Sequence, residues 1–321
     1  MSKARIFRRV GALLCALFTA YLLLDTFVIE RSYAAASEEN SSLFGTGTVL
    51  SGTEGGVLCE LSCDFSREDG EKSILLPADA EMLGSCEGEL YTIALYTFRV
   101  NDTQIYAADV VTSSAQALKT ALAEDTFGRN ITAATSEIAR TKGAALAING
   151  DFYGARQSGL VIRNGVLYRD SAASDSEVLV LYADGGVSIL DGAEADGEEL
   201  LAAGAWQAFS FGPGLLEDGQ ISVSENDEVG RAKSSNPRTA IGLIGENHYV
   251  FLVSDGRTGE SEGLSLYELA QLMEALGCTV AYNLDGGGSS TMVWEGQLVN
   301  KPTTNGKRIS ERSVSDIVYI G

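Results

Sequence analysis

Short apolar runs that end at turn-forming residues constrain this fold more than any other feature of the sequence. Residues 144–148, 249–253 and 278–282 are such runs, and each is followed by a polar or glycine-containing segment. Glycine contributes 36 of the 321 residues, well above its usual share of about 7%. Runs this short between turns are typical of strands. The sequence therefore predicts a domain with many short strands and few long helices.

Paired runs predict several hairpins. Asn164-Gly165 separates residues 160–163 from 166–168, and Asn-Gly is among the strongest signals for a two-residue hairpin turn. Further pairs are residues 90–100 with 105–111, 178–182 with 187–190, and 240–244 with 249–253. Because hairpins join antiparallel strands, we expect an α+β fold: one domain around a largely antiparallel or mixed sheet with a few packed helices.

The clearest helix is predicted at residues 265–276. Ser265 is a candidate N-cap, Glu268 stands three residues later as its partner in a capping box, and Gly277 follows the last apolar position. We expect this helix to fix the position of the strand that comes directly after it. Shorter helices are predicted at residues 115–123 and 136–140.

The N-terminus has the composition of a membrane segment. Four basic side chains precede the apolar stretch 10–29: Lys3, Arg5, Arg8 and Arg9. An uncleaved anchor needs about 20 residues to span a bilayer, whereas a signal peptide would be cleaved after the small residues that end at Ala36. We favour the anchor, with the basic flank in the cytoplasm and the rest of the chain outside it. Cleavage near Ala36, which gives a secreted protein, is the alternative.

This interpretation divides the chain into three parts. Residues 1–36 are the cytoplasmic stub and membrane segment, the polar and acidic residues 37–88 are an extracytoplasmic linker, and residues 89–321 are the folded domain. Outside the cytoplasm a disulfide is possible, and the sequence does not choose the pair among the three cysteines of the linker. These are Cys59, Cys63 and Cys86.

The charge balance excludes several classes of partner. The formal net charge is −21, and residues 171–230 contain no Lys or Arg. Such a surface repels nucleic acid, and we interpret the acidic region as a solvated face. No Asp-x-Asp-x-Asp-Gly loop indicates calcium, and His248 is the only histidine, so neither a zinc site nor a Ser-His-Asp hydrolase is expected. We expect no metal and no other cofactor.

The segment after the run 278–282 has the composition of a binding site. Asp285 stands at the end of the predicted strand, and three glycines and three hydroxyl residues follow it: Gly286, Gly287, Gly288, Ser289, Ser290 and Thr291. Glycine lets successive backbone N–H groups converge on an anion. A glycine-rich turn is often no more than a turn, and this one matches neither common nucleotide-binding pattern. Four other segments of the chain, described next, favour the binding site.

Four further segments accompany this one. They are Asn149-Gly150, Pro237-Arg238-Thr239-Ala240, Asp255-Gly256-Arg257 and Leu266-Tyr267-Glu268-Leu269-Ala270. Together with residues 283–291 they resemble the phosphodiester glycosidase family, over about residues 90–321. The resemblance implies an exported hydrolase that cleaves the glycosidic bond of a sugar-1-phosphodiester. The implied substrates are similar to N-acetylglucosamine-1-phosphodiester and belong to cell-surface or exopolysaccharide glycans.

Cleavage of a sugar C1–O–phosphate bond needs a carboxylate near the anomeric carbon and hydrogen-bond donors for the phosphate. Asp285 is the first candidate for the carboxylate, as base or nucleophile, and Asp151 is the second. Glu268 is a further candidate besides its role as a helix cap. Arginine binds two phosphate oxygens at once. Substrate or phosphate binding is assigned to Asn149, Arg238, Asp255, Arg257, Gly286, Gly287, Gly288, Ser289, Ser290 and Thr291.

A non-enzymatic function is the alternative. An anchored surface protein would use the same cleft to bind phosphate-bearing glycans during exopolysaccharide assembly, without turnover. Both interpretations predict the same partners: a phosphoglycan or sugar phosphodiester and, through the N-terminal segment, the membrane. They differ in whether free reducing sugar is released.

Overall fold

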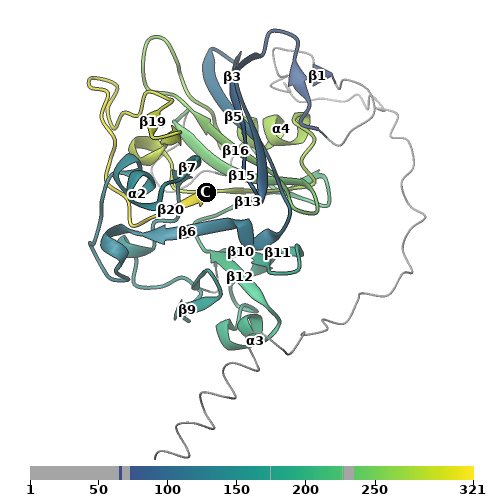
Figure 1. Cartoon of the computed structure of the whole chain (residues 1–321), viewed down its shortest axis with the longest axis vertical. Helices are drawn as coiled ribbons and strands as arrows, with labels where there is room; N and C mark the ends of the chain where they lie inside the picture. The colour runs from purple at the N-terminus through teal and green to yellow at the C-terminus, as the bar shows by residue number, and fades with distance from the viewer. Residues whose placement is uncertain (1–64, 67–72, 174, 226, 228–234) are drawn as a thin grey trace, which may run out of the picture. The chain divides into compact units, whose positions relative to one another are not determined.

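The computed structural model describes residues 65–66, 73–173, 175–225, 227 and 235–321 (Figure 1). The predicted membrane segment, most of the predicted linker and two of its cysteines, Cys59 and Cys63, lie outside these residues. Within the described residues, no helix is both long and apolar enough to span a bilayer. The third cysteine of the linker, Cys86, has a free thiol and so does Cys278.

Eight strands form the largest sheet. In spatial order they are β14 (Gln220–Ile221), β13 (Gly214–Glu217), β17 (Val280–Asn283), β15 (Arg238–Gly245), β16 (His248–Ser254), β5 (Thr103–Thr112), β4 (Tyr91–Val100) and β3 (Glu81–Glu87). The hairpins predicted within residues 90–111 and 240–253 are confirmed as β4–β5 and β15–β16. β3 pairs with β4 although it lies in the predicted linker, so the sheet begins before residue 89.

Two five-stranded sheets complete the domain. One has the order β19 (Gln297–Leu298), β18 (Met292–Trp294), β7 (Leu146–Asn149), β20 (Asp316–Ile320), β6 (Leu118–Leu122). The other has the order β11 (Val187–Asp191), β10 (Glu177–Tyr182), β12 (Ala205–Phe209), β8 (Val161–Arg163), β9 (Val166–Arg169). The hairpins predicted around residues 164–165 and 183–186 are confirmed as β8–β9 and β10–β11. A short pair, β1 (Phe65–Ser66) with β2 (Leu76–Pro77), is separate from these sheets.

The helix predicted at residues 115–123 is wrong. Only Ala115–Ala117 forms a 3-10 turn, η1, and the following residues form β6, which pairs with β20. This pairing satisfies the backbone of a mostly buried segment. Tertiary pairing therefore overrides the local preference for a helix.

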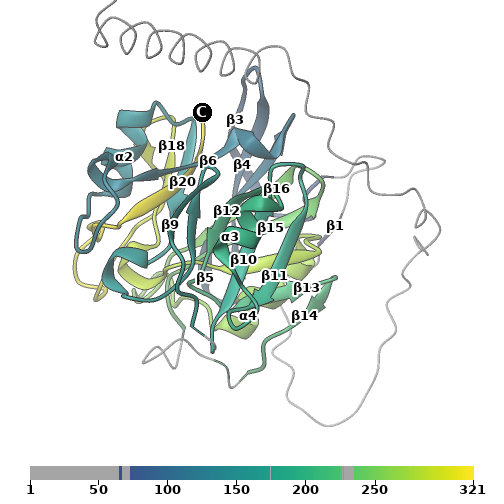
Figure 2. The ribbon, with the colours of Figure 1, turned by 90° about the horizontal axis from the view of Figure 1, so that it is seen from below.

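Among the described residues, three α-helices pack beside the sheets. α4 (Leu266–Ala275) confirms the clearest predicted helix together with its capping box. α2 (Thr135–Lys142), where a short helix is predicted, lies beside β18 and β20 (Figure 2). α3 (Gly197–Ala202) is not predicted from the sequence, and the Asp196 side chain caps it. The remaining 3-10 turns are η2 (Ala123–Asp125), η3 (Tyr153–Ala155) and η4 (Gly287–Ser289).

The eight-stranded sheet has a hydrophobic core on each face. Along β16, Val250 and Leu252 belong to the core that includes the side chains of α4. Tyr249, Phe251 and Val253 belong to the core shared with the two five-stranded sheets. This alternation is the two-residue period of a strand buried on both faces. The described domain is therefore mostly β-sheet with a few helices, and β17 leads from the middle of its largest sheet to Asp285.

Candidate active site

A cavity of about 160 Å³ lies at the end of β17. Asn283 is the last residue of that strand, and Asp285 and two of the three glycines follow it into the cavity wall. Residues distant in the sequence supply the rest of the wall: Phe211, Asn236, Arg238, Arg257 and Arg312. The predicted site residues Asp285, Arg238, Arg257, Gly286 and Gly287 are thus brought together around one space.

Asp285 is the only carboxylate among the described residues that line this cavity. It is 7% exposed. The Arg312 Nη2 group donates to Asp285 Oδ1 at 3.0 Å and to Oδ2 at 2.9 Å. Burial raises the pKa of Asp285 above its ordinary value, although Arg312 and a hydrogen bond from Ser289 act in the opposite direction. The site therefore combines a desolvated carboxylate with one close positive charge.

Three arginines give the cavity a positive wall. Arg257 Nε and Nη2 donate to Asn236 Oδ1 at 2.9 and 2.7 Å, and its Nη1 donates to the Thr304 carbonyl at 2.7 Å. Arg238 Nε donates to the Leu264 carbonyl at 2.8 Å. Burial, reinforced by Arg312, lowers the pKa of Arg257. Three guanidinium groups with one carboxylate form a site suited to an anion.

Glycine is required at residues 286–288 because other atoms of the protein lie where a side chain would begin. A Cβ on Gly286 would lie 3.0 Å from the Pro237 carbonyl oxygen, and one on Gly288 would lie 2.4 Å from Thr304 Oγ1. Gly287 has a φ of +63° and would place a Cβ 3.1 Å from Arg257 Nη2. Larger residues here would displace Arg257, Thr304 or the backbone at Pro237.

Two of the backbone N–H groups that the sequence predicts to converge on an anion donate to carbonyl groups of the protein. The Gly287 N–H donates to the Pro237 carbonyl at 2.8 Å, and the Ser289 N–H donates to the Gly286 carbonyl at 3.3 Å. Both groups are therefore satisfied within the protein. The side chains of the arginines, more than the backbone, are placed to neutralise an anion.

The hydroxyl residues act behind the cavity wall. Ser289 Oγ accepts a hydrogen bond from Arg312 Nε at 2.8 Å and so orients the arginine that contacts Asp285. Ser290 and Thr291 are fully buried and do not line the cavity. A direct contact of these last two with substrate stays a prediction that the geometry does not favour.

Asn149 connects the three chain segments that meet at the site. It is fully buried at the end of β7. Its Nδ2 donates to the Asp285 carbonyl at 2.6 Å, and its Oδ1 accepts from Thr239 Oγ1 at 2.8 Å and from the Thr291 N–H at 3.2 Å. Asn149 therefore fixes the backbone of Asp285 instead of lining the cavity.

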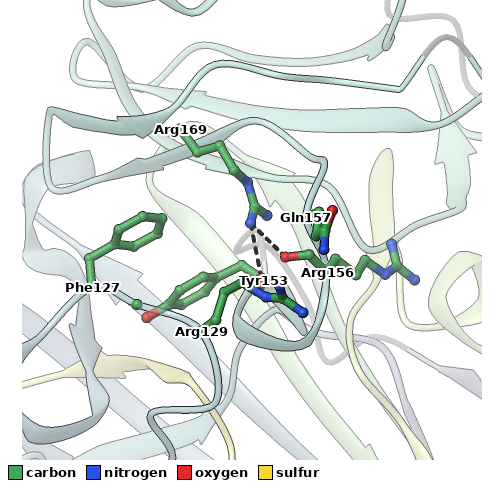
Figure 3. A pocket seen from close by; sticks show the side chains of 7 residues that line it. Phe127, Arg129, Tyr153, Arg156, Gln157 and Arg169 are labelled. Carbon is green, nitrogen blue, oxygen red and sulfur yellow. Dashed lines mark hydrogen bonds between the residues drawn. The ribbon is translucent and has the colours of Figure 1, made fainter.

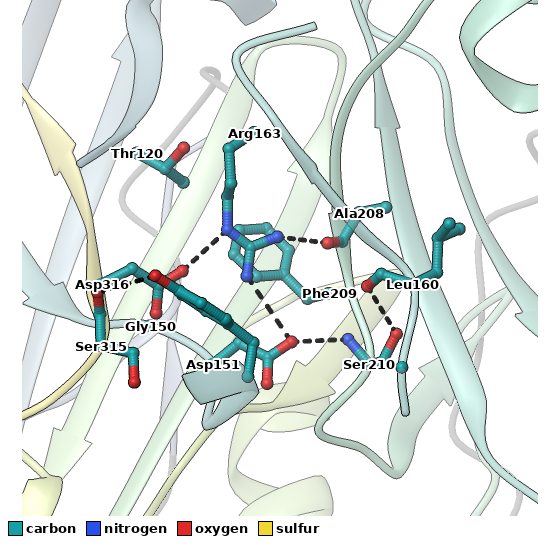
Figure 4. A network of polar contacts seen from close by, with 12 residues as sticks. Thr120, Gly150, Asp151, Leu160, Arg163, Ala208, Phe209, Ser210, Ser315 and Asp316 are labelled. Carbon is teal, nitrogen blue, oxygen red and sulfur yellow. Dashed lines mark hydrogen bonds and ion pairs between the residues drawn. The ribbon is translucent and has the colours of Figure 1, made fainter. Parts of the chain in front are cut away.

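Asp151 belongs to a buried ionic network beside the site (Figure 4). Its Oδ2 accepts from the Ser210 N–H at 2.8 Å and lies 3.6 Å from Arg163 Nη2. The Nε of the same arginine donates to Asp316 Oδ2 at 2.7 Å. Burial raises the pKa of Asp316 to about 6 while Arg163 opposes the shift. Asp151 is 3% exposed and does not line the cavity, so its contacts support a structural role.

Asp255 and Glu268 lie away from the cavity. Asp255 Oδ1 accepts from the Lys301 N–H at 2.8 Å and from Asn300 Nδ2 at 3.2 Å, and the side chain lines a separate small cavity. Glu268 Oε2 accepts from the Ser265 N–H at 2.8 Å in the capping box, and its Oε1 accepts from Asn101 Nδ2 at 3.0 Å. The cap, and not the reaction, is the role that the structure gives Glu268.

We expect Glu268→Gln to keep turnover within about twofold of the unchanged protein, because glutamine also completes a capping box. Ser265→Ala should lower the free energy of unfolding by about 1 kcal/mol, since it removes the N-cap, with the same turnover per folded molecule. Initial rates and urea unfolding measure both effects. A tenfold loss of turnover in a fully folded Glu268→Gln protein would contradict this prediction and indicate a catalytic role for Glu268.

The sequence alone missed four residues of the cavity wall: Phe211, Asn236, Asn283 and Arg312. Asn283 stands within the recognised segment, and Arg312 belongs to a basic group near the C-terminus, yet neither position indicates a role by itself. Asn283 Nδ2 donates to the Gly212 carbonyl at 2.7 Å, while its buried Oδ1 has no hydrogen-bond partner in the described part of the chain. In the same part of the chain, no group of three or more acidic, histidine or cysteine side chains is placed to hold a metal ion.

The fold and the cavity define a sheet-based domain with an arginine-rich carboxylate site, and the sequence comparison identifies its family. A model of the phosphodiester glycosidase family matches residues 142–321, more than half of the chain. The chain therefore belongs to the phosphodiester glycosidase family.

Curated relatives match part of their length. The SPbeta prophage-derived uncharacterized protein YomE of Bacillus subtilis (strain 168) is 31% identical over 199 residues, which cover 60% of this chain and 30% of that protein. The N-acetylglucosamine-1-phosphodiester alpha-N-acetylglucosaminidase of Mus musculus is 28% identical over 187 residues, which cover 53% of this chain and 36% of the mouse protein. This chain thus corresponds to about a third of each of these relatives.

Solved structures share the fold. The catalytic domain of the zebrafish N-acetylglucosamine-1-phosphodiester alpha-N-acetylglucosaminidase, auto-inhibited by its pro-peptide, superposes with a TM-score of 0.57 at 18% identity and covers 81% of this chain and 87% of its own. A hypothetical protein from Synechocystis also gives 0.57, at 16% identity over 76% of this chain and 64% of its own. At these identities the likeness establishes the fold alone.

Proposed function

We propose that this protein hydrolyses the glycosidic C1–O bond of a sugar-1-phosphodiester, of the N-acetylglucosamine-1-phosphodiester kind, on cell-surface or exopolysaccharide glycans. The observation that carries the proposal is the cavity itself, whose wall contains three guanidinium groups and the buried carboxylate of Asp285, which Arg312 contacts. Family membership and the name of the mouse relative support the substrate class.

The chemistry follows from the charges of the cavity. The departing group is a phosphate monoester, a stable anion, so it leaves without a strong acid, and Arg238 and Arg257 offset its charge. Asp285 faces the positive charge that develops at the anomeric carbon and acts as nucleophile or as base for water. One carboxylate is then sufficient, which agrees with the composition of the described cavity wall.

Arg312 has the separate task of keeping Asp285 ionised. Burial raises the pKa of this carboxyl, and the contacts at 2.9 and 3.0 Å from Arg312 limit the rise. Since only the carboxylate form is nucleophilic or basic, activity appears as pH rises through the pKa of Asp285.

We therefore expect Arg312→Gln to move the acidic limb of the kcat/KM profile to higher pH, because the lost positive charge lets the pKa of Asp285 rise further. Rates measured from about pH 4 to about pH 8 define the limb. Arg312→Lys, which keeps the charge, should restore most of the original position. If the acidic limb of the Arg312→Gln protein is unchanged, Arg312 does not control the pKa of Asp285.

The proposed location is the outer side of a cell membrane. The support is the sequence alone: a basic flank, the apolar stretch 10–29 and an acidic remainder. Residues 1–36 would be the anchor, followed by a linker and by the folded domain of residues 89–321 with its additional strand β3. Digestion of intact cells by an added protease should remove the domain, whereas full protection from the protease would place it inside.

The activity is tested directly by incubating the protein with N-acetylglucosaminyl methyl phosphate. The proposal predicts that N-acetylglucosamine and methyl phosphate are formed. A reducing-sugar assay measures the N-acetylglucosamine. Saturable binding without any release, over the same pH range, would support the alternative of a glycan-binding surface protein and contradict the hydrolase.

A further inference from the structure

A second cavity, of about 290 Å³, lies beside the turn η3 (Figure 3). Seven residues line it: Phe127, Gly128, Arg129, Tyr153, Arg156, Gln157 and Arg169. Three of these are arginines, and none of the described lining residues is acidic. The chain has a formal net charge of −21, so a cavity lined by three arginines and no acidic residue stands out from the rest of the protein.

The arginines of this second cavity form no ion pair among the described residues, although burial lowers the pKa of Arg169 and the nearby Asp151 opposes that shift. Arg169 donates to three carbonyl oxygens, those of Gly159 at 2.8 Å, Tyr153 at 3.1 Å and Arg156 at 2.9 Å. Arg156 Nη1 donates to the Ser210 carbonyl at 3.2 Å. No ion pair among the described residues includes Arg129, Arg156 or Arg169. Their positive charge is therefore available to a bound anion.

An aromatic surface forms another part of the same wall. The rings of Phe127 and Tyr153 are stacked, with centroids 5.0 Å apart and planes at 13°. Phe127 also contacts the ring of Tyr168, with centroids 5.1 Å apart. Pockets that combine such apolar surface with a few converging polar groups are typical of small-molecule sites. Sugar rings with attached oxyanions have both kinds of surface.

The second cavity adjoins the candidate active site. The Arg156 guanidinium, which lines the second cavity, lies 4.9 Å from the centroid of the Phe211 ring, and Phe211 lines the cavity of Asp285. Phe152, next to Tyr153 in the chain, lies with its ring centroid 5.9 Å from the guanidinium of Arg312. Tyr153 and Arg156 thus line the second cavity, while Arg156 and Phe152 contact Phe211 and Arg312 of the other cavity wall, so this segment runs between the two spaces.

We propose that the second cavity binds a second phosphate group of the substrate, carried by the aglycone, through Arg129 and Arg156. The proposal rests on the proposed hydrolase function and deepens it: the substrate is a glycan that carries several phosphodiesters, and not a glycoside with a single one. The aromatic surface accepts the sugar ring between the two phosphates.

Binding to the full chain with Asp285→Asn tests the proposal, because this background leaves the probes intact. The two probes are N-acetylglucosaminyl methyl phosphate and a synthetic two-unit analogue with two phosphodiesters. Calorimetry should show that the two-phosphate probe binds about tenfold more tightly than the one-phosphate probe, because its second phosphate adds charge-assisted hydrogen bonds. Arg129→Gln with Arg156→Gln should remove this ratio. Arg140→Gln, an exposed arginine on α2, is the matched control and should keep it.

The single variant Arg129→Gln guards against misfolding, since Arg129 is exposed, and it should reduce the ratio in part. Equal affinity for the two probes, or a ratio that survives the double variant, would overturn the proposal. Hydrolysis by the unchanged chain is scored separately. If neither probe is cleaved but the arginine-dependent ratio is present, the proposed hydrolase fails and the second anion site stands. If cleavage occurs without the ratio, the hydrolase stands and the second anion site fails.

Discussion

Asp285→Asn is expected to lower kcat on a sugar phosphodiester by about 10³-fold, the scale of loss for a positioned acid–base group. Asparagine keeps the size and the hydrogen bond from Arg312 but has no charge to offer the anomeric carbon. Steady-state rates with N-acetylglucosaminyl methyl phosphate measure the loss. The effect is large because Asp285 is the only carboxylate in the described wall of the cavity.

Binding distinguishes a chemical effect from a loss of structure. Removing the negative charge beside three arginines should leave the affinity for the phosphodiester unchanged or higher. Burial raises the pKa of Asp285, so the neutral amide should also leave the unfolding temperature close to that of the unchanged protein. Turnover retained in a folded Asp285→Asn protein would remove this residue from the reaction.

Arg163→Met is expected to lower the free energy of unfolding by about 3–5 kcal/mol, the usual cost of leaving a buried charge without its partner. The arginine is 2% exposed and contacts Asp316 at 2.7 Å and Asp151 at 3.6 Å. It connects β8 to β20, which belong to different five-stranded sheets. Urea unfolding measures the loss, with Arg140→Met on the exposed face of α2 as the control.

The same variant has a predicted pH dependence. Burial raises the pKa of Asp316 to about 6, so its carboxyl is largely protonated in the folded protein at lower pH and then needs Arg163 less. The loss of stability should therefore be smaller at about pH 5 than at about pH 7. A loss that is equal at both values, or greater in acid, would show that packing of the long side chain, and not its charge, holds the two sheets together.

Local patterns predicted a large part of the fold. The hairpins around Asn164-Gly165 and residues 245–248 follow from turn chemistry, and α4 follows from its capping box. These features depend on residues close together in the sequence. The segment 118–122 is different, since pairing with β20 near the C-terminus makes it a strand. No local pattern contains that information.

The candidate site shows the same limit. A strand that ends at Asp285 and a glycine-rich turn were predictable from adjacent residues. The contact of Arg312 with Asp285 and the close approach of Arg257 to Gly287 depend on how distant loops fold together. Nothing in the sequence indicated that the Gly287 N–H, predicted to bind an anion, donates to the Pro237 carbonyl. Composition predicted an anion site, but only the packing identified which of the predicted residues line the cavity.

The bond that is broken tests the central claim most directly. Arginines around a carboxylate suit attack at phosphorus as well as at carbon, and water labelled with oxygen-18 separates the two reactions. A glycosidase cleaves the C1–O bond, so the methyl phosphate formed from N-acetylglucosaminyl methyl phosphate should contain no label by phosphorus NMR. Methyl phosphate or sugar phosphate that carries oxygen-18 would show cleavage at phosphorus and would contradict the proposed function of the cavity.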